Sequence, residues 1–269
     1  MFDLLHTFHP SPLLATVGPF VIRWYGLTLA LGALAGFLTL RQLGRKIGWT
    51  PDAVTVLFVS LLAAGVLGAR LYHVLNEPAY YAAHPLDILQ VWRGGLAIHG
   101  GLIAGVLTLV LFSRRWQTRL LRLTDIVVPA VAIGQAIGRW GNYFNQELFG
   151  QATGLPWGIP IDPANRPPGF ETVEFFHPTF LYESLWLVAV FLFLRLLHRR
   201  RAAAGAVTFA YLGLAALGRL GTELLRIDDT PLLLGIRLPL LVSGTLMIVG
   251  LAGLWYCVRR SPGKPQRPG

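Results

Sequence analysis

Seven apolar stretches, each long enough to cross a membrane as a helix, alternate with short polar segments along this chain. An α-helix needs about 20 mostly apolar residues to span the hydrocarbon core of a bilayer. The pattern therefore predicts an all-α polytopic membrane protein with seven transmembrane helices, and we expect residues 1–269 to form a single integral membrane domain. The predicted spans lie near 20–40, 53–75, 95–113, 124–140, 178–197, 205–225 and 236–257.

Basic residues occupy alternate connections between these spans. They follow the first, third, fifth and seventh spans, whereas the other loops are acidic or balanced. Because cytoplasmic loops carry an excess of Lys and Arg, we expect the N-terminus outside and the C-terminus in the cytoplasm. The residues expected on the cytoplasmic side are Arg41, Arg45, Lys46, Arg114, Arg115, Arg119, Arg122, Arg195, Arg199, Arg200, Arg201, Arg259, Arg260, Lys264 and Arg267.

The segment 142–177, between the fourth and fifth spans, is the one sizeable stretch expected outside the membrane. Prolines and glycines interrupt it repeatedly, and these residues break regular helices and strands. The segment is therefore predicted to be a small irregular cap on the outer, periplasmic side rather than a second domain.

The composition also favours a membrane protein. Hydrophobic residues make up 54% of the chain and charged residues 13%, whereas globular proteins carry about a quarter charged residues. A soluble enzyme, a disordered tail and a collagen are therefore excluded. The formal net charge of +10 follows from the cytoplasmic loops, and no basic water-soluble face suggests nucleic acid as a partner. Cys257 is the single cysteine, so no internal disulfide can form.

Ionisable and polar side chains lie inside several of the spans. A charged group at the centre of a span costs at least about 2.5–3.5 kcal/mol, which makes each one a candidate functional residue. Because successive spans run in opposite directions, we expect all of these side chains at one level, in the outer half of the bilayer. The residues are Tyr25, Arg70, His99, Arg139, Tyr182, Glu183, Arg219 and Glu223.

Structural roles stay open for members of this set. Arg70 can extend toward the outer lipid headgroups, and Glu223 can neutralise Arg219, which precedes it by four residues. The two tyrosines suit the aromatic belt at a membrane surface, and His99 suits a hydrogen-bonded histidine in a helix core.

The sequence GRWGNYFNQELFG at 138–150 is the strongest candidate for a functional motif. It places Arg139, Asn142, Asn145 and Glu147 among glycines at a membrane boundary. Arginine binds phosphate through two parallel hydrogen bonds, and the abundant phosphate at this level is an anionic lipid headgroup. The motif therefore predicts a cationic pocket that opens to lipid.

Other chemistries lack their residue patterns in this chain. No Cys and His spacing fits a zinc site, and no Gly-x-Ser-x-Gly turn suggests a serine hydrolase. The seventh span has no lysine for a retinal Schiff base, and no glycine-rich loop suggests ATP hydrolysis. We therefore expect no metal and no cofactor.

Five motifs resemble those of the bacterial prolipoprotein diacylglyceryl transferases. They are IRWYGL (22–27), WRGGLAIHGGLIAG (92–105), GRWGNYFNQELFG (138–150), HPTFLYES (177–184) and GRLGTELLR (218–226), and the resemblance runs from about residue 20 to 257. Two positions depart from the family. Phe180 stands where the family usually has glutamine, and Ala215 stands where relatives often carry a tyrosine. Tyr211 lies one turn before Ala215, and whether it replaces that tyrosine stays open.

The resemblance implies an enzyme of the bacterial cytoplasmic (inner) membrane with its active site on the periplasmic side. Such an enzyme moves the diacylglyceryl group of phosphatidylglycerol to the thiol of the lipobox cysteine in a prolipoprotein signal peptide. A thioether forms and glycerol phosphate leaves, as the first step of lipoprotein maturation. An anionic-lipid carrier or flippase is the alternative, since it also needs cations, but it would make no use of His99.

The resemblance also implies roles for individual residues. Arg139 and Arg219 would hold the lipid phosphate and stabilise the charge that grows on it, with Arg226 one further turn along the same helix face. Three residues would orient Arg139 or the headgroup glycerol: Asn142, Asn145 and Glu147. The other predicted substrate-binding residues are Tyr25, Arg70, Glu223, Gly150 and Tyr182.

The acceptor thiol must lose a proton before it attacks the lipid. Histidine ordinarily titrates near pH 6.5 and suits this task near neutral pH. His99 is the one histidine expected inside a span at the outer level, and glycines on both sides leave room for a substrate. We therefore expect His99 to be the general base. The alternatives are that His99 only binds the headgroup, or that Glu147 or a tyrosine takes the proton.

Overall fold

The computed structural model describes residues 2–18, 20–200 and 202–259. The predicted cytoplasmic residues Arg201, Arg260, Lys264 and Arg267 lie outside the described residues. The chain forms two compact units: one comprises the residues up to Thr39 together with those from Val127 onward, and the other is Leu40–Ile126.

Seven long helices occupy the predicted apolar stretches: α2 Trp24–Arg45, α3 Pro51–Asn76, α5 Ile98–Arg115, α6 Leu120–Phe144, α7 Thr179–Arg199, α8 Ala206–Glu223 and α9 Leu238–Arg259. Within the described residues, all of these except α8 combine the length and hydropathy of a membrane-spanning helix. α8 is less apolar because Arg219, Thr222 and Glu223 lie in its last turns. The protein is therefore a mainly helical, polytopic membrane protein.

Two of the predicted helix boundaries are corrected by the structure. The first span is predicted from residue 20, but β2 (Phe20–Arg23) pairs antiparallel with β1 (Leu13–Val17), and the helix begins only at Trp24. Val21 and Ile22 are β-branched, which favours a strand over the first turn of a helix. The sixth span is predicted to reach residue 225, whereas α8 ends at Glu223.

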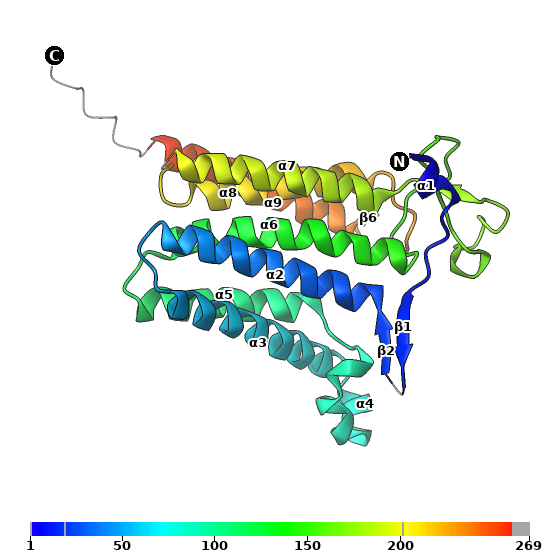
Figure 1. Cartoon of the computed structure of the whole chain (residues 1–269), viewed down its shortest axis with the longest axis horizontal. Coiled ribbons are helices and arrows are strands. Elements are labelled where there is room, and N and C mark those ends of the chain that lie inside the picture. Colours follow the sequence, from blue (N-terminus) through cyan, green and yellow to red (C-terminus); the bar gives the residue numbers. More distant parts are fainter. Residues whose placement is uncertain (1, 19, 201, 260–269) are drawn as a thin grey trace, which may run out of the picture. The chain divides into compact units, whose positions relative to one another are not determined.

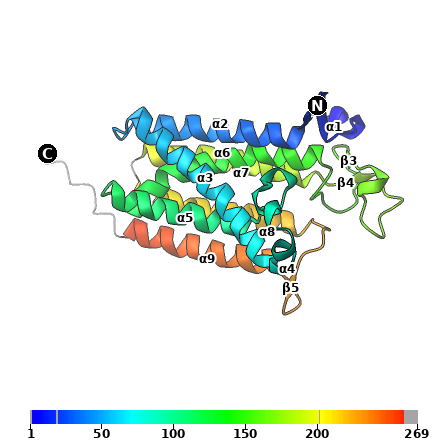
Figure 2. The same ribbon diagram turned by 90° about the horizontal axis from the view of Figure 1, so that it is seen from below.

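Small residues bring the helices of the first unit close together. A Cβ placed on Gly32 in α2 would lie 2.8 Å from the carbonyl oxygen of Gly134 in α6, and one on Gly250 in α9 would lie 2.7 Å from the Cα of Gly213 in α8. Such contacts are typical of helices that pack inside membranes. α8 packs against both α7 and α9. The axes of these three helices are roughly aligned in both views (Figures 1 and 2).

The segment between α6 and α7 is irregular. It contains the two-residue strands β3 (Ile159–Pro160) and β4 (Phe175–Phe176), which pair antiparallel, and one 3₁₀ turn, η3 (Pro163–Asn165). The short helix α1 (Phe2–Thr7) packs on it, and the His6 ring stacks on Phe175 with a centroid distance of 3.9 Å. A buried cluster lies beneath: Leu5, Tyr143, Phe149, Ile159, Ile161, Phe176, Phe180 and Leu181.

A tight hairpin joins α8 to α9. Its strands, β5 (Leu232–Leu233) and β6 (Ile236–Arg237), are linked by Leu234 and Gly235, which have φ values of 54° and 77°. Two consecutive residues with positive φ give the turn the twist that antiparallel strands favour. The hairpin places Arg237 directly before α9.

The second unit is built on the pair α3 and α5. The carbonyl oxygen of Gly100 would lie 2.5 Å from a Cβ placed on Gly68, so only glycine allows this helix crossing. Thr50 caps α3, since its Oγ1 accepts a hydrogen bond from the N–H of Ala53 at 3.2 Å. Three short elements connect α3 to α5: α4 (Pro78–Ala83), η1 (Pro85–Leu89) and η2 (Val91–Arg93).

Candidate functional site

Seven side chains of the first unit form a continuous series in which arginines and carboxylates alternate. We call this series the charge chain. Its members are, in spatial order, Arg139, Glu183, Arg219, Glu223, Arg237, Asp228 and Arg226. The N–O distances between successive members are 2.5, 3.0, 2.7, 2.8, 3.9 and 2.6 Å.

Helices of alternating direction bring these residues together. Arg139 lies in the last two turns of α6, and Glu183 lies in the first two turns of α7. Arg219 and Glu223 are separated by one turn at the end of α8, so both can share one face of the helix. Arg237 comes from β6. The structure thus brings Arg139, Glu183, Arg219 and Glu223 together at one end of their helices, as the sequence predicts.

The two glutamates of the charge chain are more deeply buried than the arginines that they contact. The side chain of Glu223 is 0% exposed and that of Glu183 is 7% exposed, whereas those of Arg139 and Arg219 are 29% and 25% exposed. A buried carboxylate needs cationic partners, because an unpaired charge loses its hydration without compensation. Glu183 and Glu223 each contact two arginines. The buried glutamates therefore orient the arginines from the protein interior, and the arginines stay partly exposed at the surface.

Arg139 is the most exposed arginine of the charge chain, with 29% of its side chain exposed, and it keeps donors for a ligand. Its Nε contacts Glu183, while its two terminal nitrogens have no partner among the described residues. Repulsion from Arg219 and Arg226 acts on the same guanidinium group. An anion at the terminal nitrogens would relieve this repulsion and could accept two parallel hydrogen bonds.

The net charge of the charge chain is one positive charge. Four arginines face three carboxylates, and arginine stays protonated in proteins. The group of ion pairs therefore has the opposite charge to a phosphodiester, which carries one negative charge.

The predicted motif continues from α6 into a strained loop. Asn142 donates from Nδ2 to Oε1 of Glu147 at 2.8 Å, and Asn145 lies 3.5 Å from the same oxygen. Gln146 and Leu148 have φ values of 51° and 57°, a conformation that few residues other than glycine adopt. The structure thus brings Asn142, Asn145 and Glu147 together, with both amides directed at the carboxylate.

Gln146 fastens this loop to the remainder of the cap. Its side chain donates to the Pro10 carbonyl and to Asp162 Oδ2, both at 2.8 Å, and accepts from the Asp162 N–H at 2.7 Å. The side chain is buried. Gln146 therefore explains how the loop holds its positive φ value, and it is a residue that the sequence analysis missed.

The position of Arg226 corrects a prediction. Arg226 is predicted on the same helix face as Arg219, but α8 ends at Glu223 and Arg226 lies beyond it. Its backbone instead pairs with Gly150 in an isolated β-bridge, and its Nε contacts Asp228 at 2.6 Å. A Cβ on Gly150 would lie 3.1 Å from the carbonyl oxygen of Leu225, which directly precedes Arg226. The glycine therefore lets the motif loop lie directly against the segment that carries Arg226.

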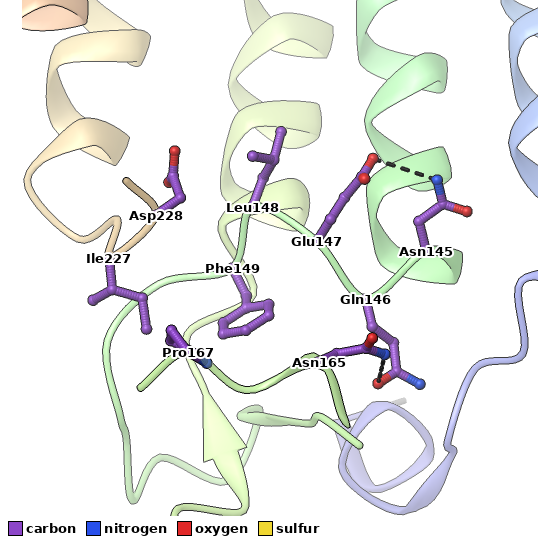
Figure 3. Close-up of a pocket in the computed structure, with 9 residues that line it drawn as sticks. All are labelled: Asn145, Gln146, Glu147, Leu148, Phe149, Asn165, Pro167, Ile227 and Asp228. Atoms are coloured by element: carbon purple, nitrogen blue, oxygen red, sulfur yellow. Dashed lines mark hydrogen bonds between the residues drawn. The ribbon is translucent and has the colours of Figure 1, made fainter. Parts of the chain in front are cut away.

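A pocket of about 430 Å³ opens between these two segments. Figure 3 shows Asn145 and Glu147 on one side of it and Ile227 and Asp228 on the other. The pocket is thus lined by two predicted site residues of the motif, Asn145 and Glu147, and by one carboxylate of the charge chain. Its remaining lining residues are Gln146, Leu148, Phe149, Asn165 and Pro167.

The predicted aromatic site residues, Tyr25 and Tyr182, have defined partners. The Tyr25 ring contacts α6, since a Cβ on Gly141 would lie 2.6 Å from its Cδ2. The Tyr182 hydroxyl accepts a hydrogen bond from Trp157 Nε1 at 2.9 Å and lies 3.1 Å from His177 Nδ1. Tyr182 thus connects α7 to the cap.

Phe180, which departs from the family motif, has a packing role, and Tyr211, one turn before the departing Ala215, has a hydrogen-bond partner. Phe180 is buried, and its ring lies 4.7 Å from that of Tyr143 and 5.3 Å from that of Trp140. Tyr211 donates its hydroxyl proton to Gln135 Oε1 at 2.8 Å. Phe180 therefore contributes to the core beneath the cap rather than to a polar site.

Arg70 lies in the second unit and is buried. It donates to four backbone carbonyls: those of Ile88 at 2.9 Å, Gly94 at 2.8 Å and Gly95 at 3.1 Å, and that of Asp87. The guanidinium carbon also lies 5.2 Å from the centre of the Tyr81 ring. Four of the five donors of the side chain are therefore used to hold the loop between α4 and α5.

A second interaction stabilises the same loop. Tyr80 donates its hydroxyl proton to Asp87 Oδ2 at 2.7 Å, and Gln90 donates to Asp87 Oδ1 at the same distance. The hydrogen bond to the carboxylate raises the pKa of Tyr80, because ionisation would remove the donated proton.

His99 lies in the first turn of α5 and is exposed on its unit. Its ring lies 5.8 Å from that of Tyr72. Gly94 and Gly95, which precede the helix, have φ values of 93° and 69°, and both accept hydrogen bonds from Arg70. His99 and Arg70 thus belong to one unit, and the charge chain belongs to the other.

Two members of the charge chain, Arg237 and Asp228, are not predicted as site residues from the sequence, and Glu183 is predicted as a candidate functional residue without an assigned role. Glu183 lies at the centre of the arginine pair, and Arg237 and Asp228 extend the series. The signal for Glu183 was its position in an apolar span, whereas Arg237 and Asp228 lie in loops and carry no such signal. Among the described residues, no three His, Cys, Asp or Glu side chains are grouped as metal ligands.

Comparison with known proteins agrees with the motifs. The family model for prolipoprotein diacylglyceryl transferases matches residues 12–256. A protein of Synechococcus sp. (strain CC9902), named phosphatidylglycerol–prolipoprotein diacylglyceryl transferase, is 44% identical over 269 residues, which cover 95% of this chain and 96% of that protein. Proteins of the same name from Synechococcus elongatus and Trichormus variabilis are 45% and 42% identical, covering 96% and 94% of this chain and 92% of each relative.

Proposed function

Because the chain belongs to the prolipoprotein diacylglyceryl transferase family, we infer that it transfers a diacylglyceryl group from phosphatidylglycerol to a prolipoprotein. This transferase reaction is the first step of bacterial lipoprotein maturation. The charge chain is the observation that supports a site for this reaction. Its buried glutamates orient the arginines, and the terminal nitrogens of Arg139 stay unpaired among the described residues.

The reaction breaks one bond and forms one bond at the same carbon. The thiolate of the lipobox cysteine attacks the glycerol carbon that carries the phosphate, a C–S bond forms, and the C–O bond to phosphate breaks. Glycerol phosphate leaves with the electron pair of that bond, so the negative charge of the phosphate grows from one toward two. Cations that are already oriented toward this phosphate stabilise the transition state more than the bound substrate.

We assign the phosphate to Arg139 and Arg219. The free terminal nitrogens of Arg139 match two phosphate oxygens, and Glu183 fixes the separation of the two arginines because it contacts both. Arg226 is assigned to the other end of the charge chain, where Asp228 neutralises its charge. Glu223 is assigned to the orientation of Arg219, which it contacts at 2.7 Å.

The pocket between the motif loop and Asp228 suits the glycerol of the headgroup. Carboxylate and amide oxygens accept hydrogen bonds from hydroxyl groups, and Asn145, Glu147 and Asp228 all line the pocket. Asn142 holds Glu147 in place. Gly150 lets the motif loop lie against Leu225, and the Tyr182 hydroxyl contacts the cap through Trp157.

We assign the proton of the acceptor thiol to His99. The competing assignments are that His99 only binds the headgroup, or that Glu147 or a tyrosine takes the proton. Tyr25 is assigned to substrate contact beside α6. Arg70 is assigned to the loop before His99, because four of its donors bind backbone carbonyls of that loop.

Incubation of the purified protein with phosphatidylglycerol and a lipobox peptide tests the function. We expect a peptide mass increased by one diacylglyceryl group, together with release of glycerol phosphate, and no product with a peptide whose cysteine is replaced by serine. Movement of phosphatidylglycerol between leaflets without any adduct would assign the chain to the lipid carriers instead.

We further propose seven spans in the cytoplasmic membrane of a bacterium, in a single domain, with an outer N-terminus, a cytoplasmic C-terminus and the cap 142–177 and active site on the periplasmic side. The support is the distribution of arginines among the loops. α8 would be the span whose charges are neutralised by partners in the charge chain.

Single cysteines at exposed positions test this orientation. Cys257 is buried, with its Sγ 3.4 Å from the Ala204 carbonyl, so it should be replaced by serine first. In cells with a permeabilised outer membrane, an impermeant maleimide should label Thr172→Cys in the cap and spare Lys46→Cys between α2 and α3. Both positions are exposed, so the opposite labelling pattern would reverse the topology.

A further inference from the structure

We propose that Arg237, on the hairpin between α8 and α9, supplies the charge that makes the charge chain a receptor for an anionic lipid, without touching the lipid itself. This inference rests on the proposed function. Arg237 lies outside the family motifs quoted above, and the hairpin of β5 and β6 positions it. We assign it as a residue that determines specificity for the lipid.

The geometry of Glu223 is the first support. Its side chain is fully buried, and its two oxygens are divided between two arginines. Oε2 contacts Arg219 at 2.7 Å, and Oε1 accepts a hydrogen bond from Nε of Arg237 at 2.8 Å. Arg219 therefore contributes only one of its terminal nitrogens to Glu223, and its other terminal nitrogen contacts Glu183 at 3.0 Å.

The charge balance of the site is the second support. Arg226 and Asp228 neutralise each other at 2.6 Å. The four residues Arg139, Glu183, Arg219 and Glu223 contain two positive and two negative charges and are therefore neutral together. Arg237 provides the one positive charge that remains.

The location of Arg237 explains how it can act without contact. It lies at the end of β6, and its own nitrogens are directed at Glu223 and Asp228. A charge acts over several ångströms where water is scarce, because the effective dielectric constant is lower than in bulk water. The positive charge of Arg237 cancels the negative charge of Glu223. The positive charge of Arg219 therefore stays available for the phosphate.

Removal of this charge should weaken binding of the anionic donor more than it slows the chemical step. In Arg237→Gln, Glu223 keeps Arg219 as its only cationic partner. The charge chain, which has one net positive charge in the wild-type protein, then becomes neutral. We expect the KM for phosphatidylglycerol in mixed micelles to rise about tenfold, equivalent to about 1.4 kcal/mol, while kcat falls by less than about threefold.

A second substitution should restore the charge. The double variant Glu223→Gln/Arg237→Gln lacks both members of the pair, so the neighbouring group again has one net positive charge. We expect its KM to lie between those of Arg237→Gln and the wild-type protein, because the net charge returns while the contact of Glu223 that orients Arg219 is lost. Arg237→Lys keeps the charge but not the planar guanidinium group, and its KM should stay within about threefold of that of the wild-type protein.

A matched control is available on the second unit. Arg93 is exposed, with a side-chain exposure of 69%, and its carboxylate contact with Asp87 is 4.0 Å long. Arg93→Gln removes the same charge at a surface position and should leave KM within about twofold. Thermal unfolding of every variant shows whether the fold is retained.

The outcomes separate the two levels of the argument. A wild-type protein that forms no adduct overturns the proposed function. If the wild-type protein is active, an unchanged KM in Arg237→Gln overturns the role of Arg237. A double variant whose KM is no lower than that of Arg237→Gln also overturns it. Should Arg237→Gln fail to fold, a folded Arg237→Lys protein with a tenfold higher KM also overturns it, since its charge is retained.

Discussion

Arg139 and Arg70 are both arginines of apolar helices, but their surroundings differ in kind. Arg139 contacts a carboxylate with its Nε and keeps its terminal nitrogens unpaired among the described residues. Arg70 donates to four backbone carbonyls of one loop and has the face of Tyr81 beside it. We infer from this difference that the partners of an arginine in an apolar helix indicate whether it serves a ligand or the fold.

The physical reason lies in the number of donors. An arginine side chain has five N–H groups in a fixed plane. A carboxylate beside Nε leaves the two terminal nitrogens for a second anion, whereas carbonyls from several loop residues use the donors and leave the positive charge without an acidic partner. The first arrangement orients a charge for chemistry, and the second fixes the conformation of a loop.

The largest effect should come from Arg139. Lysine retains the charge but cannot form two parallel hydrogen bonds with a phosphate, so Arg139→Lys should lose about a hundredfold in kcat/KM for phosphatidylglycerol. Arg139→Ala also loses the charge and should lose at least about a thousandfold, in the range measured when a preorganised donor is removed from a transition state. Transfer to a lipobox peptide measures both.

The control for Arg139 is an exposed arginine of the same unit. Arg23 ends β2 on the surface, and Arg23→Ala should retain activity within about twofold. An Arg139→Ala protein with nearly normal activity would remove Arg139 from the mechanism. Arg139 and Arg70 would then not differ in function.

The sequence predicts the helical parts of the site well, because the signals are local. Apolar stretches define the helices, and a polar residue in such a stretch stands out, so the convergence of Arg139, Glu183, Arg219 and Glu223 follows from the alternating directions of the spans. The motif at 138–150 likewise predicts that Asn142 and Glu147 lie close together, as they do in the structure.

The remaining parts depend on tertiary contacts that no local pattern contains. Arg226 was expected on a helix that ends before it, because a segment beyond α8 pairs with Gly150 instead. Arg237 lies in a polar loop, where an arginine is unremarkable, and its role appears only when the hairpin places it against Glu223. The partners of Arg70 are backbone carbonyls, which every residue has.

The second largest effect concerns His99, which shares a unit with Arg70. If His99 takes the thiol proton, His99→Asn should lose about a hundredfold of activity at pH 7, near the lower end of what general bases contribute. A cysteine thiol ordinarily ionises near pH 8.5, so the peptide provides more thiolate on its own as the pH rises. The ratio of mutant to wild-type activity should therefore increase toward pH 9, without a large change in lipid binding.

His84 provides the matched control for this pH profile. It is exposed in the same unit and lies against Tyr80, and His84→Asn should follow the wild-type profile. An activity ratio for His99→Asn that is equal at pH 7 and pH 9 would assign the proton to another group, such as Glu147, and would leave the transferase function intact.

The smallest effect on lipid binding should come from Arg70, although its effect on stability should be clear. A lysine has one nitrogen at its tip and cannot reach the four carbonyls that Arg70 binds. Each hydrogen bond to a charged group contributes about 1.5–3 kcal/mol, so Arg70→Lys should unfold at a lower temperature and exchange the amide protons of residues 87–97 faster. Exchange followed by mass spectrometry in lipid-free detergent measures this loop directly.

The same variant decides between the two kinds of arginine. A fold role predicts faster exchange at 87–97 and an affinity for phosphatidylglycerol within about twofold of the wild-type value, because four of the five donors of Arg70 bind the loop. A lipid ligand would show the reverse, with unchanged exchange and weaker binding. Activity should fall moderately in the first case, since Gly94 and Gly95 lead directly into the helix of His99, and Arg93→Gln, which loses a charge but no loop hydrogen bond, should change neither measurement.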